Sequence, residues 1–72
     1  MKEGYLQHNS QGRYEIPNIT HFTSGEPIEI SVDGIWTEGR MEFSHLDKDY
    51  YFIANDGTEV HGLTGMKARE LN

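Results

Sequence analysis

The chain has no cysteine, only two prolines and one tryptophan, and no apolar run longer than the one from Tyr50 to Ala54. Without cysteine it can form no disulfide, no thiolate nucleophile and no cysteine-based zinc site, which fits a reducing compartment. The apolar run is far shorter than the roughly 20 residues of a membrane-spanning helix. The first residues, Met1-Lys2-Glu3-Gly4, lack the apolar segment of a signal peptide. We therefore expect a cytoplasmic protein with no membrane partner.

Positive charge is also scarce, because 6 Lys and Arg stand against 12 Asp and Glu, a net charge of −6. Such an acidic chain is repelled by nucleic acids and anionic membranes unless its few cations cluster. The 72 residues predict one domain, 1–72, with one small core. A core of this size rarely contributes more than about 3–5 kcal/mol to stability.

The pattern that is present is typical of β-strands. Ile28, Ile30 and Val32 alternate with polar residues and therefore share one face of a strand. The pair Asp33-Gly34 that follows is a strong hairpin signal, and a second Asp-Gly pair follows the aromatic run 50–53. We predict an all-β fold of five or six short antiparallel strands. A small SH3-like barrel or a strongly curled sheet is favoured, because closure hides strand edges.

The expected strands follow from turn residues between apolar segments. A first hairpin pairs 5–8 with 13–16 around the loop 9–12, and an irregular segment, 17–25, then carries Ile19 and Phe22 as plugs of the core. Further strands are expected at 27–32, 35–43, 50–55, 59–61 and 66–71.

The register of the central hairpin has two solutions. A two-residue turn at Asp33-Gly34 places Ile35 and Met41 on the face of Val32, with Trp36 on the opposite face. Bulges at Gly34 and Gly39 would instead turn Trp36 toward the core. We favour the double bulge, because it buries the only tryptophan and because small barrels need such bends. The predicted core is then Leu6, Tyr14, Ile16, Phe22, Ile28, Ile30, Val32, Trp36, Met41, Phe43, Ile53, Val60, Leu63, Met66 and Ala68.

No motif indicates catalysis or metal binding. The four histidines, at 8, 21, 45 and 61, lack the spacing of a zinc site, although those at 8, 45 and 61 could meet at one end of a barrel. The carboxylates at 47, 49, 56 and 59 lie in polar turns rather than in an evident cleft. Neither a nucleophile elbow nor a phosphate loop is present. We predict no enzyme, no catalytic residue, no metal and no cofactor.

A set of basic and aromatic residues offers a possible interaction surface. The set is Tyr5, Arg40, Tyr50, Tyr51, Lys67 and Arg69. Exposed aromatic residues are enriched at protein interfaces, so the first hypothesis is a non-enzymatic interaction or accessory module that binds another protein, or itself as a weak homodimer. The alternative is a small nucleic-acid-binding barrel that uses Arg40, Lys67 and Arg69. Cross-strand ion pairs with nearby glutamates explain the three cations more simply.

Six short motifs resemble a family of very small bacterial domains of unknown function that also occurs in phage and other mobile elements. The motifs are Gly4-Tyr5-Leu6, Gly12-Arg13-Tyr14, the hairpin from Ile28 to Trp36, Arg40-Met41-Glu42, Tyr51-Phe52, and Gly65-Met66-Lys67-Ala68-Arg69. The resemblance implies a compact β-barrel without established activity, and it supplies no catalytic residues. It also suggests that the domain stabilises or regulates a neighbouring product of the same mobile element.

Overall fold

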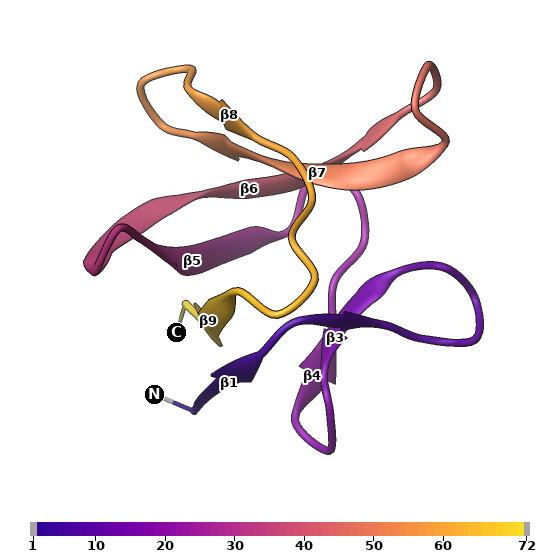
Figure 1. The fold of residues 1–72 in the computed structure, drawn as a ribbon, viewed down its shortest axis with the longest axis horizontal. Coiled ribbons are helices and arrows are strands. Elements are labelled where there is room, and N and C mark those ends of the chain that lie inside the picture. Colours follow the sequence, from indigo (N-terminus) through magenta and orange to yellow (C-terminus); the bar gives the residue numbers. More distant parts are fainter. Residues whose placement is uncertain (1, 72) are drawn as a thin grey trace.

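A computed structural model describes residues 2–71, which form nine strands in two antiparallel sheets (Figure 1). The strands are β1 Glu3–Tyr5, β2 Gln7–His8, β3 Tyr14–Ile16, β4 Thr20–His21, β5 Pro27–Val32, β6 Ile35–Ser44, β7 Asp49–Ala54, β8 Glu59–Val60 and β9 Lys67–Glu70. The all-β class is confirmed, and the predicted number of strands was too low. No helix in the described range is long and apolar enough to cross a membrane.

The larger sheet has the order β1-β9-β5-β6-β7-β8, and β2-β3-β4 form the smaller one. The edge strands of the larger sheet, β1 and β8, do not pair with each other, so the prediction of a closed barrel was wrong. The pairing of β8 covers only Phe52↔Val60 and Ile53↔Glu59. The chain then enters β9, which lies between β1 and β5 and pairs with both. No strand among residues 2–71 pairs with the outer edge of β1 or of β8.

The central hairpin adopts the two-residue turn. Asp33 and Gly34 have φ of 52° and 82°, the left-handed values that a type I′ turn requires at both positions. Pairing then runs without a bulge from Val32↔Ile35 to Pro27↔Arg40. The double-bulge prediction was therefore wrong, because this turn already matches the twist of the strands.

This register decides which residues form the core. The buried residues are Leu6, Tyr14, Ile16, Phe22, Ile28, Ile30, Met41, Phe52, Ala54, Leu63 and Ala68, with Ile19, Val32, Tyr50, Val60 and Met66 partly buried against them. Trp36 and Ile53 were predicted in the core but lie on the outer face of the larger sheet, the face opposite the core. Phe43 is only partly buried. Phe52 and Ala54, which were not predicted in the core, are buried instead. Phe52 lies in the bulky run 50–53, whose pattern does not show which side chains point inward.

Gly39 is a position for close packing rather than for a bulge. A Cβ added there would strike the carbonyl oxygen of Ile53 and would lie 2.7 Å from the Phe52 ring and 2.8 Å from the Ala54 Cα. The missing side chain lets the Phe52 ring lie over the backbone of β6, and this packing seals the core.

The smaller sheet is built on the predicted first hairpin. Gln7 pairs with Glu15 and His8 pairs with Tyr14. The Asn9 side chain accepts hydrogen bonds from the backbone N–H groups of Gln11 and Arg13, at 2.9 and 3.1 Å, and thereby fixes the loop. The short strand β4 was not expected, because the segment 17–25 has no strand-like alternation.

Candidate functional site

Five of the six predicted surface residues share the outer face of the six-stranded sheet. Side chains alternate along a strand, and the pairing places Tyr5, Arg40, Tyr51, Lys67 and Arg69 opposite the core. The structure therefore brings together residues from four strands on one face.

Tyr50, the sixth predicted residue, does not belong to this face. It points inward, is partly buried against the core, and packs edge-on against Phe43 with ring centroids 5.0 Å apart. Its prediction as an exposed aromatic residue was wrong, because the run of bulky residues in β7 hides which of them point inward.

Trp36 also lies on this outer face, opposite Ser31 near the β5–β6 turn, where the favoured register did not expect it. The Cζ atom of Arg69 lies 4.0 Å from the centroid of the Trp36 ring, a cation–π contact. The Arg69 Nε donates a hydrogen bond of 2.6 Å to Glu29 Oε1, and these two side chains are only 23% and 15% exposed. Indole, guanidinium and carboxylate thus form one ordered cluster. The alternative register, with a two-residue turn at Asp33-Gly34, would have placed Trp36 on this outer face.

The other two predicted cations are also paired with carboxylates. The Arg40 Nε donates to Glu42 Oε2 at 2.7 Å. The Lys67 Nζ lies 3.1 Å from Glu3 Oε1, and this hydrogen-bonded partner raises the pKa of Lys67. Each positive charge of the face is therefore balanced by its own negative neighbour.

One carboxylate on the same face is left over. Glu38 lies directly opposite Glu29 in the pairing of β5 and β6. The Glu38 carbonyl accepts a hydrogen bond from Asn55, so this is a non-hydrogen-bonded pair of β5 and β6, in which side chains are closest. Like charges directly opposite each other destabilise a sheet. Glu38 is exposed and has no ion-pair partner among residues 2–71.

Another aromatic residue of the face, Tyr51, stacks on His61. Their ring centroids are 4.7 Å apart and the rings are nearly parallel, at 7°. His61 Nε2 lies 3.0 Å from Glu59 Oε1, and His61 Nδ1 lies 3.5 Å from Asp47 Oδ2. Carboxylates therefore lie beside both ring nitrogens of His61.

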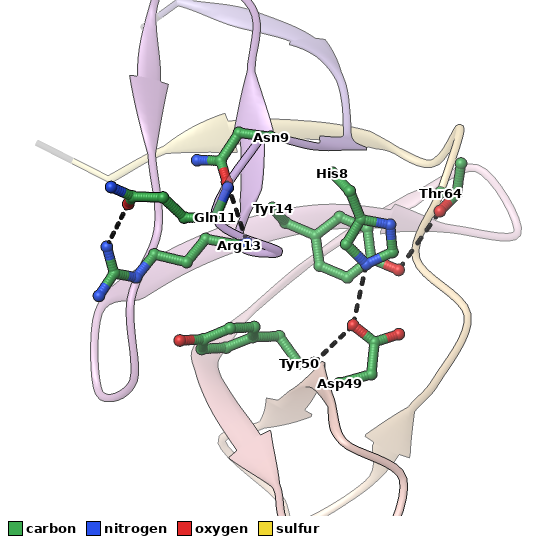
Figure 2. A network of polar contacts seen from close by, with 8 residues as sticks. All are labelled: His8, Asn9, Gln11, Arg13, Tyr14, Asp49, Tyr50 and Thr64. Atoms are coloured by element: carbon green, nitrogen blue, oxygen red, sulfur yellow. Dashed lines mark hydrogen bonds and ion pairs between the residues drawn. The ribbon is translucent and has the colours of Figure 1, made fainter.

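A second histidine, His8 of the smaller sheet, contacts the first residue of β7. The His8 ring stacks on Tyr14 at 4.1 Å and its Nε2 lies 2.9 Å from Asp49 Oδ1, while the Tyr14 hydroxyl lies 3.3 Å from the Thr64 hydroxyl (Figure 2). The Asp49 carboxylate also accepts the Tyr50 backbone N–H at 2.8 Å. The contact between His8 and Asp49 links the smaller sheet to β7 of the larger sheet. In the described part of the chain no three His, Asp or Glu side chains are placed to hold a metal ion.

Three of the hollows in the surface of residues 2–71 lie beside the sheets. One of about 440 Å³ follows β1 beside Ile16 and Ile19, and one of about 450 Å³ lies between Asp49 and His61. The third, which we call the hairpin cleft, holds about 190 Å³ between the β5–β6 and β7–β8 hairpins. Its lining is mostly apolar, with Val32, Thr37, Phe52, Ala54 and Val60, and with Asp56 and Thr58 at one side.

Comparison with known families assigns most of the chain. A family described as a domain of unknown function, DUF5348, matches residues 4–70. The chain belongs to the DUF5348 family. No curated protein matches it, and no solved structure matches it either.

The DUF5348 match includes every residue of the outer face from Tyr5 to Arg69, together with the hairpin cleft. It confirms the expectation of a small domain family of unknown function. Since the family description gives no activity, any function must be argued from the surface itself.

Proposed function

We propose that this DUF5348 domain is a non-enzymatic protein-interaction module whose binding surface is the outer face around Trp36. The observation that carries the proposal is that the only tryptophan lies outside a core that is closed without it. Tryptophan and arginine are the residues most enriched where binding energy concentrates in protein interfaces. Here Trp36 and Arg69 are in contact and are already ordered by Glu29.

Preorganisation supports the same proposal. Side chains that are fixed before binding lose less conformational entropy when a partner docks. The Trp36–Arg69 contact and the stacked Tyr51–His61 pair both hold aromatic rings in place on the outer face. The pairing of all three cations with glutamates favours a protein partner over a nucleic acid, which would need them for its phosphates.

The test is capture of a partner on the immobilised domain, compared between variants. We expect the unaltered domain to capture a protein from a lysate of the source organism. The variants Trp36→Ala and Tyr51→Ala should each recover at least about tenfold less of that protein. Leu46→Ala is the matched control, because Leu46 is 92% exposed in the β6–β7 turn, outside the strands of the outer face. The captured protein, once purified, should bind the unaltered domain and Leu46→Ala more tightly than Trp36→Ala and Tyr51→Ala. Equal recovery by all four proteins would contradict the proposal, and so would specific retention of DNA or RNA instead of a protein.

A further inference from the structure

We propose that the free edge of β6 at Trp36 pairs with an extended segment of the partner protein, in which one large apolar residue stands next to a lysine or arginine. This inference rests on the proposed function and adds where the partner binds and what chemistry it carries. Three features of the structure support it: an unpaired stretch of strand, an apolar cleft beside that stretch, and the charge around both.

The first feature is that the first three residues of β6, Ile35 to Thr37, have a neighbouring strand on one side only. β7 pairs with β6 from Gly39 to Ser44 and then turns away, while β5 continues along β6 to Ile35 (Figure 1). Trp36 lies two residues before Glu38 and, like it, is in a non-hydrogen-bonded pair with β5, so its N–H and C=O point away from β5. Neither group has a backbone partner among the residues that the structure describes. Such an edge is a template for the addition of a strand.

The second feature is the hairpin cleft, which opens beside this edge. In a strand added along β6, the residue opposite Thr37 would point to the inner side of the sheet, because side chains alternate. The cleft lies there, lined by Val32, Phe52 and Val60. Its volume of about 190 Å³ is below the range of roughly 300–1,000 Å³ typical of small-molecule sites. It suits one large apolar side chain.

The third feature is charge. The position opposite Glu38 is taken by Asn55, so the added residue opposite Trp36 would point to the outer face, beside the Trp36 ring and near the unpaired Glu38 carboxylate. A lysine or arginine there can contact the ring and the carboxylate together and relieve the repulsion between Glu38 and Glu29. Asp56, whose pKa is lowered by the hydrogen bond from the Thr58 backbone N–H, places a second carboxylate at the side of the cleft.

Charge also distinguishes between possible occupants. In the described range no lysine or arginine lines the cleft. A second copy of this chain would bring a net charge of −6 toward the same carboxylates, whereas a basic segment is attracted to them. We therefore commit to a separate, basic partner.

The experiment uses a short blocked peptide with one leucine between two lysines and threonine elsewhere. Trp36 is the only tryptophan, so its fluorescence reports binding directly. We expect a saturable change with a Kd of about 10–100 µM. We also expect hydrogen exchange of the Trp36 amide to slow at least about tenfold, because this N–H gains a partner. Peptides with glutamate in place of lysine, or serine in place of leucine, should bind at least about tenfold more weakly.

A pair of variants tests the role of Glu38 in the folded domain. Glu38→Lys is expected to weaken binding of the lysine peptide about tenfold. Glu26→Lys makes the same change of charge at an exposed site before the other end of β5 and should leave binding unchanged.

Three results would overturn the inference. They are no fluorescence change up to about 1 mM peptide, equal binding of the glutamate peptide, and protection of the Trp36 amide by self-association without peptide. If the captured partner still needs Trp36 while the lysine peptide fails, only this inference falls. If the partner is also indifferent to Trp36, the proposed function falls with it.

Discussion

Glu38→Gln should make the free domain more stable, because it removes one of two opposed negative charges. Side chains in such a pair have Cβ atoms about 4.5–5.5 Å apart. Two unit charges 4 Å apart repel by about 1 kcal/mol in water. The carboxylates of Glu29 and Glu38 can diverge, and Arg69 already neutralises Glu29, so we expect a gain of about 0.3–0.8 kcal/mol. For a domain of this size, 1 kcal/mol corresponds to about 4–8 °C, which predicts a rise in Tm of about 2–5 °C.

Thermal unfolding followed by circular dichroism, at low salt and in about 1 M NaCl, checks this prediction. At 1 M salt the screening length is about 3 Å, so the gain should largely disappear. Glu26→Gln removes a charge from an exposed residue outside the strands and is the matched control, expected to leave Tm nearly unchanged. A Tm for Glu38→Gln that is equal or lower, or a gain that persists in high salt, would refute the reasoning about opposed charges.

Three further predictions concern the fold. Gly39→Ala should destabilise by about 1–3 kcal/mol in urea unfolding, because its Cβ meets the Ile53 carbonyl; a cost below about 0.5 kcal/mol would contradict this packing. Phe52→Ala should cost about 3–5 kcal/mol, comparable to the whole stability, so its circular dichroism at 25 °C should be that of an unfolded chain, and a cooperative melt would argue against a central place for Phe52. The turn held by Asp56 should be stabilised above about pH 4 and loosen as the pH falls further, since folding lowers the pKa of Asp56; the Thr58 amide shift should follow this titration and should not do so in Asp56→Asn.

Much of the fold could be predicted from local pattern. The alternation in β5, the Asp-Gly turns and the Asn9 loop each specify local geometry, and the structure contains all of them. The side chains of the run 50–53 could not be assigned to faces, because every residue in it is bulky. The position of Trp36 depended on one choice, between a two-residue turn and a pair of bulges at Gly34 and Gly39, and that choice reverses the side chains between these two glycines.

The candidate site was predicted only in part, for a related reason. The sequence indicated that cations and glutamates would lie on one outer face, and the structure pairs them there. The contact between Trp36 and Arg69 joins residues far apart in the chain, and no local pattern encodes it. The free edge of β6 depends on where β7 leaves the sheet, which is a property of the assembled sheet.

The most direct measurement is an NMR titration of the isotopically labelled domain with the purified partner. The backbone amides and the Trp36 indole report on each surface of the molecule separately. A footprint on the outer strands, with its largest shifts at Trp36 and Arg69, is what we predict. Shifts restricted to β2, β3 and β4, with the indole unmoved, would mean that the molecule binds through a different surface.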